Sequence, residues 1–208
     1  WNDVYYKERP RLGIPKDKAL LLNDETGLHP SLGSFKELYD EGSLAILNNV
    51  GYPDPDRSHF RSMDIWQSAS ASNEFVSTGW IGRYLDEQCM NCEKSTQALE
   101  IDDVLSMALK GEKMKGLAMK DPKRLFNTSN EKFFRALAAQ QHQAQHEQPV
   151  DYLYKTLAET VSSADYIYNQ SKTYKTSIQY PSTETGRSLR TIASLILSDI
   201  NTKVYYLS

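Results

Sequence analysis

Apolar residues recur at helical spacing in several stretches of the chain, and two of these stretches lead into short apolar runs. Residues 31–42 have this spacing and end at Gly42, a residue type that commonly terminates helices. The nearly continuous apolar run 44–50 follows directly. A second helical pattern, 186–200, leads into residues 203–207, which are rich in β-favouring side chains. The pattern predicts two units of helix followed by strand, with 44–50 and 203–207 as buried central strands.

Shorter elements are predicted between these two units. The periodicity favours helices over four ranges: 58–68, 80–88, 121–145 and 150–175. Three short strand candidates lie between Ala98 and Met119. The closing helix carries five apolar residues on one predicted face: Leu189, Ile192, Ala193, Ile196 and Ile200. Because the stretch from about 121 to 180 is polar over much of its surface, we interpret it as a helical cap or insertion.

Helices that alternate with buried strands predict a layered α/β fold with a mainly parallel sheet flanked by helices. The chain has 208 residues, 39% of them hydrophobic, which suffices for one substantial core, so 1–208 is interpreted as a single domain. A formal net charge of -3 argues against a nucleic-acid partner, which would require a basic face. No stretch has the length and apolarity of a membrane span, so a soluble chain is expected.

The two ends of the chain suggest a piece of a longer protein. Trp1 stands where an initiator methionine would be expected, and the predicted strand 203–207 continues almost to the final residue. We therefore expect an internal segment whose neighbouring segments lie outside this sequence.

The most polar short stretch, "GYPDPDRSHFRSMDIWQ" at 51–67, lies where a predicted strand meets a predicted helix. In open α/β sheets, ligands bind beyond the carboxyl ends of strands, where the first turn of the next helix offers free N–H groups to an anion. Ser58 stands at this predicted helix start, either as its N-cap or as a nucleophile or anion contact. A dyad of Ser58 with His59 is not expected, because adjacent helical residues diverge by about 100°.

Four charged residues near Ser58, together with His59, complete the candidate site. Asp54 and Asp56, with His59, are candidate metal ligands, although aspartates beside prolines also form ordinary turns. Arg57 and Arg61 are candidate substrate-binding residues, because a guanidinium binds phosphate or sulfate through two parallel hydrogen bonds. His59 is included with them as a substrate-binding candidate.

Two further motifs have competing interpretations. Cys89 and Cys92 form a single C-x-x-C motif, which favours a local disulfide in an oxidising compartment; a structural zinc site would need two more ligands, and a redox or metal module is the more distant alternative. The tyrosines between Asp151 and Tyr180 either line a carbohydrate groove or pack in a helical core, and core packing is the default interpretation.

Four blocks of sequence carry a resemblance to a known family. They are "GLHPSL" at 27–32, "LYDEGSLAILNNVGYPDPDRSHFRSMDIWQ" at 38–67, "GWIGRYLD" at 79–86 and "TGRSLRTIASLI" at 185–196. In this order they resemble the bacterial family catalogued as domain of unknown function 1501, which is regarded as similar to the sulfatase and alkaline phosphatase superfamily. The blocks span most of the chain, whereas the section from about 89 to 182 is less diagnostic.

The resemblance implies an alkaline phosphatase-like fold, present here in part, in a protein that a twin-arginine signal exports to the periplasm or the outside of the cell. In the family pattern a "GGNDG"-like segment precedes the position of Trp1 and a "GGFDTH"-like segment follows that of Ser208. By the superfamily analogy these two segments supply metal-binding carboxylates and histidine. The resemblance therefore implies a divalent metal (zinc, calcium or magnesium) in the full-length protein, none in this chain, and an inactive isolated chain.

Two functions of different classes follow. The first is an internal segment of an exported, sulfatase- or phosphatase-like hydrolase that cleaves a small anionic or carbohydrate-like ester, with Ser58 as nucleophile. The alternative is a non-catalytic secreted or cell-envelope binding protein that keeps the fold. The sequence leaves the substrate and the oligomeric state open.

Overall fold

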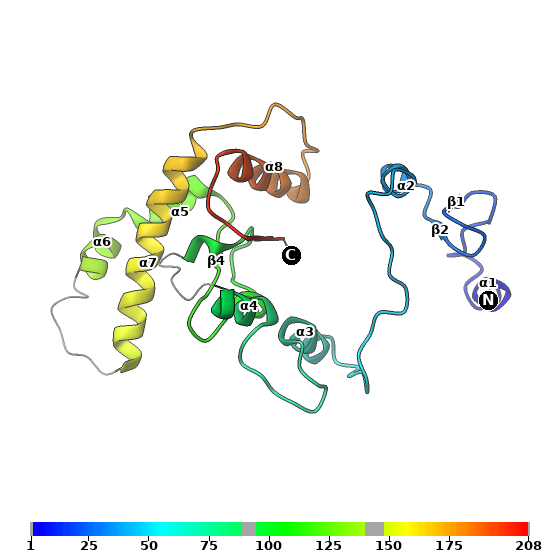
Figure 1. The fold of residues 1–208 in the computed structure, drawn as a ribbon, viewed down its shortest axis with the longest axis horizontal. Coiled ribbons are helices and arrows are strands. Elements are labelled where there is room, and N and C mark those ends of the chain that lie inside the picture. Colours follow the sequence, from blue (N-terminus) through cyan, green and yellow to red (C-terminus); the bar gives the residue numbers. More distant parts are fainter. Residues whose placement is uncertain (1, 89–94, 140–147, 208) are drawn as a thin grey trace. The chain divides into compact units, whose positions relative to one another are not determined.

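The computed structural model describes residues 2–88, 95–139 and 148–207, and the chain divides into two compact units, Trp1–Gly51 and Tyr52–Ser208 (Figure 1). Both units contain helices and short strands, so the protein is mixed α/β. Among the described residues no helix combines the length and the apolar character that crossing a membrane requires.

The first unit is built from short elements. They are the helices α1 (Asn2–Glu8) and α2 (Gly33–Asp40) and the antiparallel strands β1 (Leu20–Leu21) and β2 (Gly27–Leu28). The helix predicted over 31–42 is confirmed as α2. It ends as the sequence indicated, because Gly42 adopts a φ of 74° and the N–H of Ser43 donates to the Leu38 carbonyl at 2.8 Å.

The prediction that 44–50 forms a buried central strand is wrong. These residues have no regular secondary structure, and the side chains of Leu47 and Val50 are 81% and 63% exposed. An apolar run specifies a buried strand only if neighbouring strands complete its hydrogen bonds, and none of the described residues pairs with this run. The composition of 44–50 favours a strand, but no described strand lies beside it to complete its hydrogen bonds.

The second unit contains the remaining elements. They are α3 (His59–Ser68), α4 (Trp80–Gln88), the 3-10 turn η1 (Ser95–Gln97), β3 (Ala98–Glu100), the 3-10 turn η2 (Met107–Leu109), β4 (Leu117–Ala118), α5 (Pro122–Ser129), α6 (Lys132–Ala139), α7 (Gln148–Ser171), α8 (Glu184–Leu197) and β5 (Val204–Tyr206). The helices predicted over 58–68 and 80–88 are thereby confirmed. Of the three strand candidates between Ala98 and Met119, the middle one forms η2 instead.

A small parallel sheet organises this unit. Its strand order is β4-β3-β5, and β3 pairs in parallel with both neighbours, with Leu99 opposite Leu117 on one side and Tyr205 on the other. The predicted strand at 203–207 therefore exists as β5, but its predicted central position is wrong. It is an edge strand among the described residues, and its side chains are half-buried.

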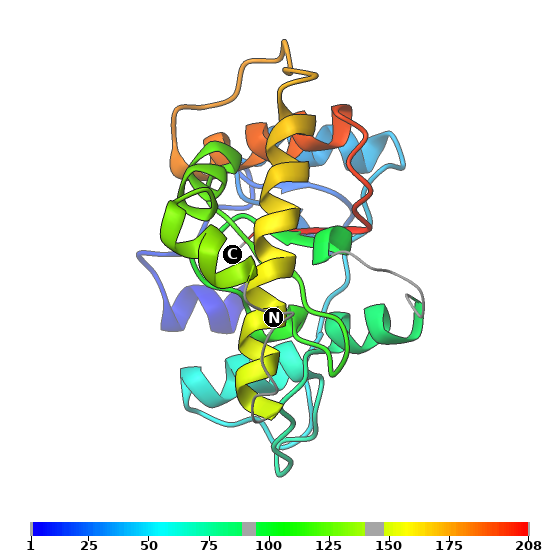
Figure 2. The same ribbon diagram turned by 90° about the vertical axis from the view of Figure 1, so that its left-hand side faces the viewer.

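Two apolar clusters cover the two faces of the sheet. Leu99 packs with Ile167 of α7 and Leu195 of α8, whereas its neighbour Ala98 packs with Leu85 of α4 on the other face. Adjacent strand residues point to opposite faces, so β3 contributes to both layers. Figure 2 shows α7 crossing one face of this unit, with α5 and α6 beside it.

The helices α5, α6 and α7 lie in the stretch from about 121 to 180, which the sequence pattern indicates to be a helical cap or insertion. Both α5 and α6 pack against α7, where Phe126 stacks on Tyr168 with ring centroids 4.1 Å apart and Arg135 pairs with Asp165 at 2.6 Å. The helix predicted over 121–145 is interrupted at Asn130, whose side-chain amide donates to the Phe126 carbonyl at 2.9 Å and ends α5. A short polar side chain that satisfies a terminal carbonyl competes with helix continuation.

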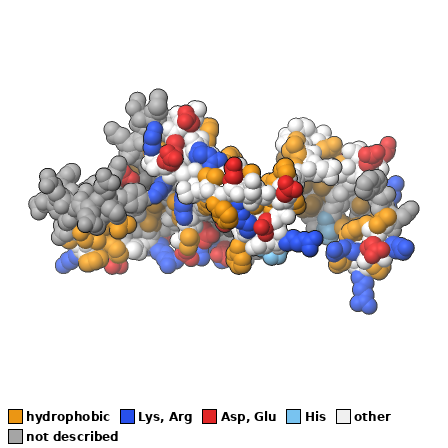
Figure 3. Space-filling model, turned by 90° about the horizontal axis from the view of Figure 1, so that it is seen from below, with side chains coloured by type: hydrophobic (Ala, Val, Ile, Leu, Met, Phe, Trp, Pro, Cys, Tyr) orange, Lys and Arg blue, Asp and Glu red, His pale blue; other side chains and the backbone are white. Residues whose placement is uncertain are grey.

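The buried face of α8 differs from the predicted one. Leu195 is fully buried and Ile192 packs beside it, whereas Leu189 and Ile196 of the predicted face are 45% and 55% exposed. Helical periodicity alone cannot decide this, because α8 carries apolar residues around much of its circumference. Hydrophobic side chains also reach the surface elsewhere, interspersed with charged ones (Figure 3).

Candidate functional site

The Ser58 turn is organised by local hydrogen bonds. Ser58 is the N-cap of α3, and its hydroxyl oxygen accepts the N–H of Arg61 at 3.4 Å, while its own N–H donates to a carboxylate oxygen of Asp56 at 2.7 Å. The hydroxyl of Tyr52 accepts the N–H of Asp56 at 3.1 Å and bonds to Ser62 at 2.8 Å. The structure therefore gives Ser58 the capping role that the sequence allowed, and its catalytic role remains a prediction.

The charged neighbours of Ser58 do not converge on one point. Asp54, Arg57 and His59 are exposed, and Asp54 adopts a φ of 51°, which is unusual for a residue other than glycine. Arg61 is half-buried and turns toward the loop after α3, where it donates to the carbonyls of Ser72 and Glu74. Its guanidinium carbon also lies 3.9 Å from the centre of the Phe75 ring. In this structure Arg61 fixes a loop.

The predicted metal and cysteine sites cannot be assembled from the described residues. Within 2–88, 95–139 and 148–207, no three His, Cys, Asp or Glu side chains are grouped as ligands of one metal ion would be, and Asp54 and Asp56 belong to no such group. Cys89 and Cys92 lie outside the described residues. The metal and disulfide assignments stay predictions.

A cavity of about 580 Å³ lies where the three parallel strands end. Ile101 and Asp102 follow β3, Lys120 and Asp121 follow β4, and Leu207 follows β5, and all of them line it. The first turns of α8 complete the wall with a polar set: Glu184, Thr185, Arg187, Ser188, Arg190 and Thr191. We call this space the α8 cavity. Figure 1 shows α8 beginning on the side where β5 ends, which is the geometry expected at the carboxyl edge of a parallel sheet.

The start of α8 is fixed by its cap and by a close backbone contact. The hydroxyl oxygen of Thr183 accepts the N–H of Gly186 at 3.1 Å, so Thr183 is the N-cap. A Cβ at Gly186 would lie 2.2 Å from the Pro181 carbonyl oxygen, so this position excludes larger residues. The helix therefore begins at a defined point, and its positive dipole end faces the cavity.

The cations of the α8 cavity differ in their availability. Lys120 lies 2.6 Å from Asp103 and 3.8 Å from Glu184, and its hydrogen bond to Asp103 is the main reason that its pKa is raised. Arg187 donates to the Ser182 carbonyl at 2.5 Å. Arg190, by contrast, hydrogen-bonds to none of the described residues. Its guanidinium is the cation with the most donors left for a ligand.

A second cavity of about 410 Å³ adjoins the first and shares Asp121, Arg190 and Thr191 with it. Tyr168 and Tyr174 also line it. We call it the tyrosine cavity. The two cavities follow α8 in succession, because Arg187 lines the first and Ser194 the second.

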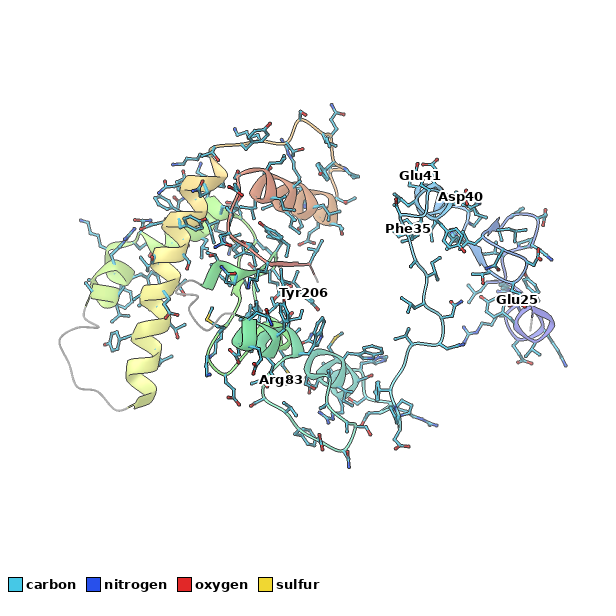
Figure 4. All side chains as sticks on the ribbon, in the orientation of Figure 1. Glu25, Phe35, Asp40, Glu41, Arg83 and Tyr206 are labelled. Carbon is cyan, nitrogen blue, oxygen red and sulfur yellow. The ribbon has the colours of Figure 1, made fainter. Side chains whose placement is uncertain are left out.

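Side chains on the α4 side of the sheet perform structural tasks. Figure 4 shows Arg83 on α4 and Tyr206 on β5. Arg83 donates to the carbonyls of Ser68 at 2.7 Å and Thr78 at 2.8 Å, and it thereby joins the end of α3 to the start of α4. Tyr206 packs against the apolar cluster that contains Leu85.

The sequence reasoning missed the α8 cavity, although two signals for it were present. The strand at 203–207 was predicted, and the helix before it starts in the block "TGRSLRTIASLI". Applying the rule for strand ends to β5 as well as to 44–50 would have selected Arg187 and Arg190. Comparisons of the chain with protein-family models, with curated proteins and with solved structures gave no match.

Proposed function

We propose that this chain is the anion-binding part of an exported sulfatase- or phosphatase-like protein that, in its full length, hydrolyses a small anionic ester with the help of a divalent metal. The observation that supports it best is the α8 cavity, which joins the carboxyl ends of three parallel strands to the start of a capped helix. The resemblance of four sequence blocks to domain of unknown function 1501 supports the same class of protein.

The cavity offers suitable chemistry for a phosphate or sulfate group. Arg190 can donate two parallel hydrogen bonds to such a group, and the hydroxyls of Thr185 and Ser188 lie in the same wall. The positive end of the α8 dipole adds a further attraction for an anion. Asp102 and Asp121 in the lining favour a ligand that also presents hydrogen-bond donors, such as the hydroxyls of an ester's alcohol part.

The reacting groups of the proposed hydrolase are only partly present in this chain. Ser58 is the candidate nucleophile, with Arg57, His59 and Arg61 as its candidate substrate-binding neighbours. None of these four residues lines the α8 cavity, so the described residues do not join the proposed anion site to the candidate nucleophile. The described residues do not form a complete metal site, since Asp54 and Asp56 are not grouped with a third ligand. We therefore assign no step to a metal here, and by the resemblance its ligands would come from the flanking segments of the full-length protein.

The alternative is a binding protein without turnover, and one observation favours it. The Ser58 hydroxyl is exposed and occupied as an N-cap, which is a sufficient reason for a serine at that position. A binding protein would need the α8 cavity but not a reactive Ser58.

The test uses the full-length protein loaded with zinc, calcium or magnesium and supplied with aryl phosphate and aryl sulfate esters. As a hydrolase it turns over one of them, Ser58→Ala removes most of the turnover, and Arg190→Ala raises KM. Exposed Arg11 is the matched control, because Arg11→Ala removes the same charge outside the cavity. Unchanged turnover in a folded Ser58→Ala protein removes Ser58 from the catalytic residues. Binding without turnover of any ester selects the binding-protein alternative.

A further inference from the structure

We propose that the ligand is a phosphate or sulfate ester of a sugar, with its anionic group in the α8 cavity and its sugar ring in the tyrosine cavity. This inference rests on the proposed function and adds the part of the ligand that carries no charge. It assigns Arg190 as the residue that contacts the anionic group from between the two cavities, and Tyr174 as the residue that contacts the ring.

The two cavities share part of their lining. Asp121, Arg190 and Thr191 line both, so the two spaces are neighbours along α8. Along α8 the lining passes from Arg187 in the α8 cavity to Ser194 in the tyrosine cavity. At about 580 and 410 Å³, each space falls in the size range of small-molecule sites. A ligand with two parts can therefore occupy both.

The chemistry changes from one cavity to the other. Both contain cations, but the α8 cavity presents a helix start, whereas the tyrosine cavity presents two aromatic rings together with Ser171, Lys123 and Lys175. Aromatic faces beside hydroxyl and amine donors suit a sugar, which has apolar C–H faces and hydroxyls around its edge.

The two tyrosines of the tyrosine cavity differ in how firmly they are held. Tyr168 is held in place, because Phe126 stacks on it and the Lys172 amine lies 3.7 Å from its ring centroid. Tyr174 is 54% exposed and makes no hydrogen bond or ring contact with the described residues, so its ring is available for stacking.

A hydrogen-bond acceptor lies where the two cavities meet. One carboxylate oxygen of Asp121 accepts the N–H of Arg124 at 2.7 Å and caps α5, while its other oxygen is bonded to none of the described residues. This oxygen can accept a hydrogen bond from a hydroxyl of the sugar at the point where the ring joins the anionic group.

The test is a calorimetric titration of the 208-residue chain with inorganic phosphate, glucose 6-phosphate and phenyl phosphate, and with the corresponding sulfates. We expect the sugar ester of one anion to bind at least about ten-fold more tightly than the bare anion, since ring stacking adds to the same anionic contact. Tyr174→Ala should remove this advantage and leave the affinity for the bare anion unchanged. Arg190→Ala should weaken both, and Arg11→Ala neither.

The outcomes separate this inference from the function on which it rests. If the bare anions and all of the esters fail to bind, the proposed anion site itself is overturned. If the bare anion binds and glucose 6-phosphate or 6-sulfate binds no more tightly, only the sugar assignment fails. Tighter binding of the phenyl ester than of the sugar ester overturns the sugar in favour of an aryl group. Tyr174 is exposed, and a circular dichroism spectrum checks that its alanine variant is folded.

Discussion

Two helices of the second unit begin in nearly the same way and differ in what surrounds them. Ser58 caps α3 by accepting an N–H at 3.4 Å, and Thr183 caps α8 by accepting one at 3.1 Å. Ser58 follows an irregular, exposed segment, whereas α8 packs through Leu195 on the sheet and begins beside a cavity at the strand ends. A capped helix start is thus a local property, but a binding site at such a start requires the sheet.

The largest expected effect on stability comes from weakening the packing of α8 on the sheet. Leu195 is fully buried, and Leu195→Ala should lower the free energy of unfolding by about 2 to 5 kcal/mol, because it leaves a cavity in the core. Urea denaturation measures this loss. The matched control is Ile196→Ala on the exposed side of the same helix, with a loss below about 1 kcal/mol. Equal losses for the two variants would show that the buried face of α8 is assigned incorrectly.

The second prediction concerns Asp86, whose carboxylate is bound by backbone N–H groups of the same chain. The carboxylate of Asp86 accepts three backbone N–H groups, those of Glu112 at 2.7 Å, Lys113 at 3.1 Å and Met114 at 2.7 Å. Asp86→Ala should cost about 2 to 3 kcal/mol of stability, since charged hydrogen bonds are lost and their donors are left without a partner. Neighbouring Glu87→Ala serves as the control in the same denaturation experiment. A loss no greater than that of the control would contradict this role of Asp86.

Removing the two caps tests the comparison directly. Ser58→Ala and Thr183→Ala should each lower stability by about 1 kcal/mol, because each deletes one N-cap hydrogen bond. The affinity of the 208-residue chain for phosphate should fall only for Thr183→Ala, which loosens the first turn beside the α8 cavity. Denaturation measures the stability of each variant and calorimetry measures its affinity for phosphate, so the two experiments separate a capping role from a binding role. A fall in phosphate affinity for Ser58→Ala would place the anion site at α3 instead.

The smallest effect concerns Tyr205 of β5, which packs against the same cluster as Leu195. Burial raises the pKa of Tyr205, so the folded chain holds this proton more tightly than the unfolded chain does. The associated stability is fully present below the unfolded pKa of about 10 and is lost as the pH rises through the folded pKa. Tyr205→Phe should therefore lose less stability than the wild type between about pH 9 and 11 in denaturation experiments. Identical pH profiles would exclude this coupling.

Short-range rules predicted much of the fold. The cap at Ser58, the C-terminal glycine of α2 and the bounds of α4 all follow from a few neighbouring residues. These three features depend on interactions within a turn or two of the chain, which is what a sequence pattern records. The parallel sheet followed from the alternation of helices with apolar runs.

The features that were missed depend on partners far away in the sequence. Residues 44–50 have the composition of a strand and remain exposed, because no described strand pairs with them. Leu195 rather than Ile196 is buried because of the way α8 lies on the sheet, and Arg190 lines two cavities only because α5, α7 and α8 meet there. The order of strands in a sheet is set by the whole fold, and periodicity does not contain it.

The pairing of β3 with β5 has a consequence for how the second unit folds. A hydrogen bond of 2.7 Å joins Thr202 to Thr96, two residues that are 106 positions apart. The chain must close this long loop before the third strand is in place, and the entropy of closure opposes each attempt. Contacts of such high sequence separation slow folding, whereas the helices α5, α6 and α7 make nearby contacts that form quickly. We expect the helical cap to assemble first, and the α8 cavity to exist only after the slowest step of folding is complete.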